Sequence, residues 1–133
     1  MNTSLQRILC VEDEPDIQTI VRIALETVGR FELLVCGSGQ AAVEAAPAFA
    51  PDLVLLDVMM PGMDGPATLT ALRALPKLAH TPVVFMTAKV QSHEVARYRQ
   101  MGAVNVIAKP FDPMTLADTL RGIWDGCAAR VAS

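Results

Sequence analysis

Polar residues with the side chains that metal and phosphoryl chemistry use follow short apolar runs along the chain. Two acids, Glu12 and Asp13, follow the first run, and a third acid, Asp57, follows another. The hydroxyl of Thr87 and the ammonium of Lys109 each follow a further run. Three carboxylates brought together would repel one another unless a cation joined them, and hard oxygen ligands are those that Mg²⁺ prefers. The pattern favours a Mg²⁺ site beside groups that bind anionic oxygens, which is the equipment of phosphoryl transfer.

The apolar runs have the length and composition of buried strands. They are rich in Val, Ile and Leu and mostly continuous, which is typical of strands covered on both faces of a parallel sheet. The expected strands are residues 8–11, 31–36, 53–56, 83–86 and 104–107. Ligands of such sheets collect outside the carboxyl ends of the strands. The polar residues are therefore expected to meet at one edge.

Helical periodicity fills the segments between the expected strands. Pro15 suits the first turn of the first helix and Gly29 its end. Ser38 is placed to cap a second helix, and Pro47 should kink or stop that helix near Ala46 because proline lacks a backbone donor.

The three later helices also carry start and stop signals. Pro66 opens the third and Pro76 closes it, while Ser92 caps a fourth that runs to Met101. The fifth begins at Asp112 and should end at Gly126. Five alternating β and α units predict an α/β fold with a doubly wound, five-stranded parallel sheet and right-handed crossovers.

Length and composition limit the functions that the chain can have. Its 133 residues suit a single domain, with a core over about 7–126 and a short tail at 127–133. The chain is 52% hydrophobic and 19% charged, which argues against disorder, and its apolar runs are too short to span a bilayer. A net charge of −3 gives no basic field for nucleic acid or anionic membranes, so neither is an expected partner.

The N-terminal residues and the cysteines indicate the cellular compartment. The first seven residues lead into an apolar run far shorter than the core of a signal peptide, so we expect a cytoplasmic protein. Cys10, Cys36 and Cys127 are widely spaced, without a C-x-x-C pair or a histidine at metal-ligand spacing. Neither a zinc site nor a disulfide is indicated, and we expect buried thiols.

Four segments together resemble the signature regions of response-regulator receiver domains from two-component signalling. They are residues 11–14 (VEDE), 56–65 (LDVMMPGMDG), 86–88 (MTA) and 108–111 (AKPF). Their order and spacing match as well, and the resemblance extends over roughly 7–126. Four motifs matching together are far more specific than any one of them.

The resemblance implies a metal site and a phosphoacceptor. Glu12, Asp13, Asp57 and the backbone carbonyl of Met59 would hold Mg²⁺. Asp57 would take a phosphoryl group from a histidine kinase or a histidine phosphotransfer protein. The implied fold is flavodoxin-like, with strand order 2-1-3-4-5, and the implied protein is a signalling domain that turns over no external substrate and is therefore not an enzyme.

The resemblance also assigns the neighbours of the acceptor. Thr87 would turn toward the phosphoryl oxygens, Lys109 would pair with one of them, and the small Ala88 would leave room for the donor. The peptide bond from Lys109 to Pro110 would be cis, a form that proline tolerates.

Three positions depart from the family pattern or affect its rates. Val106 stands where many receivers have Tyr or Phe, and a valine cannot make the same rotamer switch. We therefore expect switching through residues 87–91 and the fourth helix. The resemblance implies that Met59 and Lys89 occupy positions that in the family tune how fast the acyl phosphate hydrolyses: an apolar Met59 should hinder the attacking water, while Lys89 could bring one in.

Two alternatives use the same residues differently. Phosphatases of the haloacid-dehalogenase class also combine an aspartate nucleophile, Mg²⁺, a hydroxyl and a lysine, but place the nucleophile after the first strand. A receiver-like scaffold that is never phosphorylated is the other alternative, and the intact acidic site argues against it.

Because the sequence contains no helix-turn-helix, kinase or cyclase motif, we expect output by binding an unidentified downstream protein. We expect a monomer or a weak, phosphorylation-dependent dimer.

Overall fold

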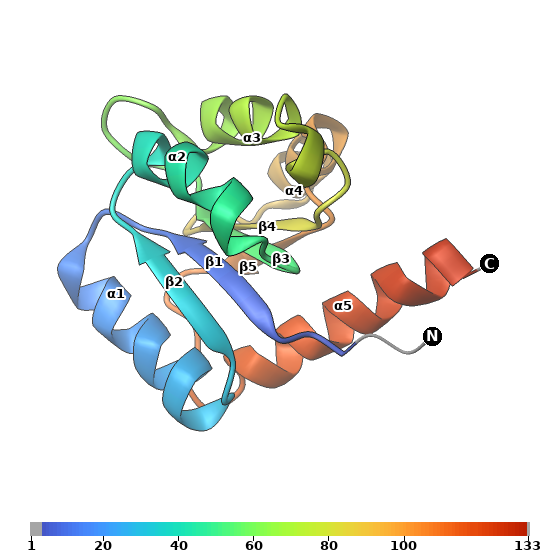
Figure 1. Ribbon diagram of the computed structural model, residues 1–133. Coiled ribbons are helices and arrows are strands. Elements are labelled where there is room, and N and C mark those ends of the chain that lie inside the picture. Colours follow the sequence, from blue (N-terminus) through green and yellow to red (C-terminus); the bar gives the residue numbers. More distant parts are fainter. Residues whose placement is uncertain (1–3, 133) are drawn as a thin grey trace.

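The computed structural model describes residues 4–132, with side chains through Cys127, and within that range it contains one parallel sheet (Figure 1). Its strands lie in the order β2-β1-β3-β4-β5, which confirms the expected doubly wound, flavodoxin-like topology. Every neighbouring pair is parallel. The strands are β1 (Arg7–Val11), β2 (Glu32–Cys36), β3 (Leu53–Asp57), β4 (Val83–Thr87) and β5 (Asn105–Ala108).

Helices cover both faces of the sheet. On one face, buried residues of α2 (Gly39–Phe49), α3 (Gly65–Arg73) and α4 (Ser92–Met101) pack with Leu9, Val54 and Phe85 of the strands. On the other face, α1 (Pro15–Arg22), the π-helical segment η1 (Ile23–Val28) and α5 (Leu116–Ala132) pack with Ile8, Leu55 and Met86. A short 3-10 helix, η2 (Pro76–Leu78), follows α3.

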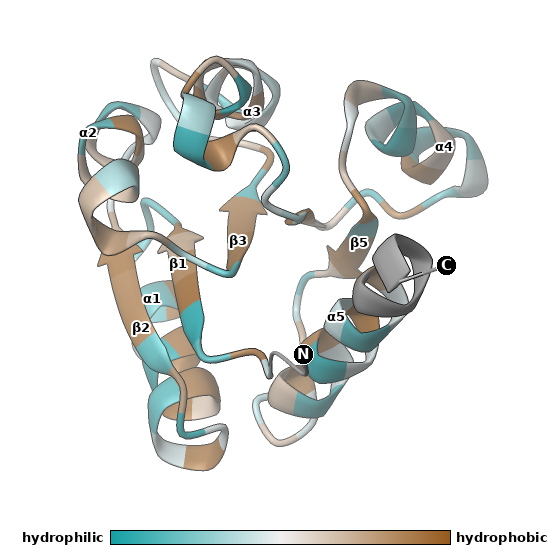
Figure 2. Cartoon of the chain, turned by 45° about the vertical axis from the view of Figure 1, so that its right-hand side comes forward, coloured by the Kyte–Doolittle hydropathy of each residue, from teal (hydrophilic) through white to brown (hydrophobic). Residues whose placement is uncertain are grey.

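The strands are apolar on both faces because both faces are covered. β3 and β4 are buried along their whole length, and Figure 2 shows hydrophobic colour along most of β1 and β2, after a hydrophilic start. The helices carry both kinds of residue, since each has one covered and one open side. The apolar runs of the sequence are therefore continuous because helices cover both faces of the sheet.

The second helix corrects one of the two outcomes expected for Pro47, a stop near Ala46. α2 does not stop near Ala46 but continues to Phe49, with Pro47 inside its last turn. Ala50 ends the helix in a left-handed conformation, φ 53°, and its N–H donates to the carbonyl of Ala46 at 2.9 Å. Ala46 is buried and Phe49 packs against the same core. Tertiary packing thus holds the turn despite the missing proline donor.

The fifth helix corrects the expected C-terminal boundary. α5 begins at Leu116, after a turn in which the Asp112 carboxylate accepts from the N–H of Met114 at 2.8 Å. It passes through Gly126 and extends to Ala132, so residues 127–132 are helical and do not form a separate tail. Residue 133 lies outside the described part of the chain, as do residues 1–3. The helix continues because an exposed glycine weakens a helix by only about 1 kcal/mol.

Smaller differences affect the third and fourth helices. α3 ends at Arg73, and Pro76 starts η2 rather than directly closing α3. The side chain of Asp64 caps α3 by accepting from the N–H of Ala67 at 2.9 Å. Ser92 is the first residue of α4 and not its cap, because Gln91 holds the cap position without a side-chain bond.

The cysteines are free thiols. Cys10 and Cys36 are buried, as expected, and Cys127 is half-buried. Burial raises the pKa of the Cys10 thiol well above its ordinary value, with further contributions from the nearby charges of Glu12 and Asp57.

Across residues 4–132, none of the helices combines the length and the apolar character needed to cross a membrane. The cytoplasmic location inferred from the sequence stays a prediction.

Candidate functional site

The acidic residues of β1 and β3 meet because their strands are neighbours in register. Val11 pairs with Leu56, so Glu12 and Asp57 each come one residue beyond a paired position at the same end of the sheet. Each of Glu12, Asp13 and Asp57 offers an oxygen within 4.8 Å of the others. Glu12 is 0% exposed and Asp57 1%, while Asp13 is half-buried. Three negative groups therefore share one partly dehydrated site, as the sequence indicated.

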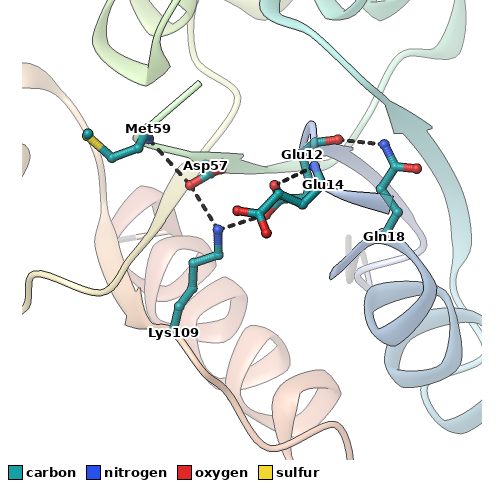
Figure 3. Close-up of polar contacts among 6 residues, drawn as sticks. All are labelled: Glu12, Glu14, Gln18, Asp57, Met59 and Lys109. Carbon is teal, nitrogen blue, oxygen red and sulfur yellow. Dashed lines mark hydrogen bonds and ion pairs between the residues drawn. The ribbon is translucent and has the colours of Figure 1, made fainter. Parts of the chain in front are cut away.

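Lys109 is the cation that faces this cluster (Figure 3). Its Nζ lies 2.8 Å from Oε1 of Glu12 and 3.1 Å from Oδ1 of Asp57. Burial alone would lower the pKa of the ammonium, but pairing with Glu12 and Asp57 outweighs that effect and raises the pKa above its ordinary value. Lys109 therefore stays charged beside both carboxylates.

Backbone and amide donors fix the first acidic residue. The N–H of Glu14 donates to Oε2 of Glu12 at 3.1 Å, and the side-chain amide of Gln18 donates to the Glu12 carbonyl at 2.6 Å (Figure 3). Sequence reasoning missed Gln18, since an amide one turn into a helix carries no distinctive signal. Only the fold shows that this side chain reaches back to the end of β1.

The oxygens left without donors show what the cluster can bind. Oδ1 of Asp13 and Oδ2 of Asp57 are buried and have no hydrogen-bond partner. The contact of Lys109 with Oε1 of Glu12 is short, but it lacks hydrogen-bond geometry and is an ion pair. Unpartnered buried carboxylate oxygens are unfavourable unless a cation joins them. Hard oxygens of this kind fit Mg²⁺, so the chain has an acidic group that could hold a metal ion.

Met59 lies beside the cluster through its backbone. Its N–H donates to Oδ1 of Asp57 over a long 3.4 Å, and its side chain is 67% exposed and points away from Asp57 (Figure 3). Ligation by the Met59 carbonyl, implied by the family resemblance, stays a prediction.

Thr87 ends β4 next to the acceptor strand. Asp57 pairs with Met86, one residue before Thr87, and Thr87 is 2% exposed. The Thr87 hydroxyl accepts from the N–H of Lys89 at 3.0 Å, while its carbonyl accepts from the N–H of Lys109 at 2.9 Å. The hydroxyl thus belongs to the turn after β4, directly beside the exposed Ala88.

Gly65 has a role that the sequence only partly indicated. A glycine after a strand usually indicates a turn, but the backbone of Gly65 lies so close to β3 that an added Cβ would be 2.6 Å from the Asp57 carbonyl. The same Cβ would be 2.7 Å from Cα of Val58. Gly65 therefore lets the loop after β3 pack directly against the residue that carries the acidic side chain. The expected cis peptide between Lys109 and Pro110 is confirmed.

Residues 8–121 match the family model of the response regulator receiver domain. The chain belongs to this family. Receiver domains are signalling domains rather than classical enzymes, and the family interacts with histidine kinases. This membership explains why the acids after β1 and β3 and the lysine after β5 occur together.

Several known proteins are similar to this receiver domain in sequence. The DNA-binding response regulator MtrA of Mycolicibacterium smegmatis is 39% identical over 121 residues, which are 91% of this chain and 51% of that protein. The sensor protein GacS of Pseudomonas syringae pv. syringae is 35% identical over 98% of this chain and 14% of its own length. The chain thus spans about half the length of the response regulators it matches, and much less of the sensor.

Solved structures share the fold along most of the chain. The chemotaxis protein CheY4 of Vibrio cholerae superimposes with a TM-score of 0.83 and 28% identity, covering 90% of this chain and 99% of that one. The signal receiver domain of a signal transduction histidine kinase from Syntrophus aciditrophicus has a TM-score of 0.77 and 32% identity, with 91% of each chain covered.

Proposed function

We propose that this receiver domain is a phosphoacceptor, and that Asp57 takes a phosphoryl group from a phosphohistidine of a histidine kinase or phosphotransfer protein. One observation carries the proposal. Asp57 has one oxygen held by Lys109 at 3.1 Å and a second, Oδ2, that is buried without a partner. An oriented carboxylate with one unsatisfied oxygen, beside a fixed cation, is arranged to act as a nucleophile toward an anionic group.

The proposed transfer forms one bond and breaks one. An oxygen of Asp57 attacks phosphorus, the bond from phosphorus to the donor nitrogen breaks, and the electron pair of that bond leaves with the imidazole. The imidazole then takes a proton from solvent if its other nitrogen does not already carry one. The product is an acyl phosphate on Asp57, with no change in oxidation state. Positioning and charge compensation are the main contributions of the protein to this class of reaction.

Lys109 supplies the fixed positive charge of the proposed reaction. Its ammonium already pairs with Asp57, and its raised pKa keeps it protonated near neutral pH. An anionic phosphoryl group on Asp57 would give the ammonium a further partner next to the present one. Thr87, which ends the adjacent strand, would supply a hydroxyl after its turn rearranges, and the exposed Ala88 would leave the approach open.

We propose Glu12, Asp13 and Asp57, with the carbonyl of Met59, as the residues that would hold Mg²⁺. When bound, this cation neutralises the acidic cluster and the charge of the incoming phosphoryl oxygens. The oxygens Oδ1 of Asp13 and Oδ2 of Asp57 support this assignment because they are buried and have no hydrogen-bond partner among the described residues. Lys109 cannot neutralise three carboxylates alone.

The partners follow from the same proposal. We propose a histidine kinase or phosphotransfer protein as the donor and an unidentified protein as the target, with the chain acting as a single receiver domain. MtrA is named as DNA-binding, and GacS as a sensor, over lengths that exceed the matched segments. The absence of nucleic acid among the partners of this chain, and its monomeric or weakly dimeric state, stay predictions.

Phosphoramidate tests the proposed donor chemistry because it carries the same phosphorus–nitrogen bond as phosphohistidine. The protein should gain one phosphoryl group in the presence of Mg²⁺, detected by intact mass and removed by hydroxylamine, which cleaves acyl phosphates. Reduction with borohydride should locate the modification at residue 57. A stable adduct on a histidine, or an adduct that survives hydroxylamine, would contradict the proposal.

A further inference from the structure

Gln18 connects helix α1 to the acidic end of β1. Its backbone N–H donates to the carbonyl of Glu14 at 3.0 Å, which is the first turn of the helix. Its side chain turns back past that turn, and Nε2 donates to the carbonyl of Glu12 at 2.6 Å (Figure 3). The side chain is part of neither the acidic cluster nor the sheet. It connects α1 to the segment after β1 that carries Glu12 and Asp13, two of the three acids.

Each polar group of Glu12 except one has a neutral donor or acceptor. The N–H donates to the carbonyl of Cys36 at 3.0 Å, Oε2 accepts from the N–H of Glu14, and the carbonyl accepts from Gln18. The remaining oxygen, Oε1, has no hydrogen-bond partner and lies 2.8 Å from the ammonium of Lys109. Of the contacts to Glu12 named above, only that of Gln18 comes from an uncharged side chain.

The next residue, Asp13, depends on the peptide that Gln18 holds. The Glu12 carbonyl and the Asp13 N–H belong to one planar peptide unit, so fixing the carbonyl fixes the orientation from which the Asp13 side chain starts. Oδ1 of Asp13 is buried without a hydrogen-bond partner, and its neighbours Glu12 and Asp57 are acids. Repulsion therefore favours movement of Asp13 away from the cluster, and the held peptide opposes the part of that movement in which the Glu12–Asp13 peptide plane turns.

We propose that Gln18 is a positioning residue of the cation site: it locks the Glu12–Asp13 peptide so that the Asp13 carboxylate stays directed at Glu12 and Asp57. This inference rests on the proposed role of the acidic cluster in holding Mg²⁺. Groups that orient metal ligands without touching the metal commonly change metal affinity by about tenfold or more when they are removed.

The test compares Mg²⁺ affinity in two helix variants by isothermal titration calorimetry. Gln18→Met removes the donor and keeps the length and the helix propensity of the side chain. Thr19→Val is the matched control, because it removes a hydrogen bond to the Pro15 carbonyl, 3.1 Å long, at an exposed position of the same helix turn. We expect Mg²⁺ affinity to fall roughly tenfold in Gln18→Met and to stay at the wild-type value in Thr19→Val.

A kinetic measurement separates positioning from general loss of structure. With acetyl phosphate as donor, the Mg²⁺ concentration for half-maximal phosphorylation should rise in Gln18→Met, while the rate at saturating Mg²⁺ should stay close to that of the wild type. Gln18→Asn, whose amide is one methylene too short to span the same gap, should behave like Gln18→Met. Gln18→Asn also replaces Gln18→Met in both measurements if the methionine variant does not fold.

The outcomes distinguish this inference from the proposed metal site. If Asp13→Asn leaves Mg²⁺ binding intact, the metal site itself is wrong. If Asp13→Asn abolishes binding but both Gln18 variants bind Mg²⁺ like the wild type, only the role of Gln18 is overturned. Equal weakening in Thr19→Val, or a melting temperature in EDTA that falls while Mg²⁺ affinity does not, would also overturn that role.

Discussion

Nζ of Lys109 lies 3.1 Å from Oδ1 of Asp57, so the side chain that follows β5 compensates the carboxylate that ends β3. The two residues are brought together across β4, which lies between their strands. Asp57 is 1% exposed, and a buried carboxylate needs such a partner when no metal is bound. We therefore expect Lys109 to stabilise the fold as well as to contribute to the proposed chemistry.

Removing this cation should destabilise the metal-free protein. We expect Lys109→Met to lower the free energy of unfolding in EDTA by about 2 to 3 kcal/mol, because it leaves Glu12 and Asp57 without their cation. Urea denaturation followed by circular dichroism measures the change. Lys77→Met, at an exposed lysine of η2, should change stability by less than about 0.5 kcal/mol. Equal effects in the two variants would contradict a compensating role for Lys109.

Removing the charge of Asp13 should instead stabilise the metal-free protein. Like charges a few ångströms apart near a protein surface repel by about 3 kcal/mol, and solvent around the half-buried Asp13 screens part of this. We expect Asp13→Asn to raise the free energy of unfolding in EDTA by about 1 kcal/mol and to remove the added stability that Mg²⁺ gives the wild type. Thermal melts with and without Mg²⁺ measure both effects.

The control for this substitution is Asp16→Asn, at an exposed acid in the first turn of α1. It should lose a little helix stability and retain the full response to Mg²⁺. If Asp13→Asn is less stable than the wild type in EDTA, the electrostatic account of the cluster is wrong.

Two glycines should respond in opposite directions to alanine. Gly65→Ala places a Cβ 2.6 Å from the Asp57 carbonyl, so the loop must shift, and we expect a loss of about 1 to 3 kcal/mol together with slower phosphorylation. Gly122→Ala, in α5 with nothing within 4 Å of the new Cβ, should gain up to about 1 kcal/mol. Chemical denaturation of both variants gives the signs, and a neutral Gly65→Ala would show that the close approach has no consequence.

Signal transmission should use α4 and not the position of Val106. Val106 pairs with Phe85 of β4, and Phe85 contacts Tyr98 of α4 edge-to-face at 5.3 Å between ring centroids. Since valine offers no aromatic switch, amide shifts on adding beryllofluoride and Mg²⁺ should be largest in residues 87–91 and α4. Nuclear magnetic resonance spectra measure this directly. Shifts centred on Val106, with α4 unchanged, would contradict the expectation.

The sequence was sufficient to predict those features that depend on local pattern. Continuous apolar runs predicted buried parallel strands, and acids or hydroxyls at the ends of these runs predicted the composition of the site. The register of β1 against β3 then brings Glu12 and Asp57 together, as the general rule for parallel sheets requires. Strand order came from family resemblance, because periodicity does not determine which strands are neighbours.

The features that were missed depend on contacts between distant segments. Pro47 stays helical because Ala46 and Phe49 pack against the core, which local proline chemistry does not indicate. Gly65 is required by the backbone of β3, and its sequence signal is only that of a turn. In the sequence, Gln18 resembles any polar residue of a surface helix, and only the fold brings its amide to the Glu12 carbonyl after β1.

Phosphorylation of Asp57 can be measured as a change of intact mass after incubation with acetyl phosphate and Mg²⁺, with Asp57→Asn in parallel. We expect a gain of one phosphoryl group, about 80 Da, in the wild type, and no gain in Asp57→Asn or when EDTA replaces Mg²⁺. An equal gain in Asp57→Asn would show that Asp57 is not the acceptor. So would the absence of any adduct in the wild type together with no binding of beryllofluoride, which would identify the chain as an unphosphorylated scaffold.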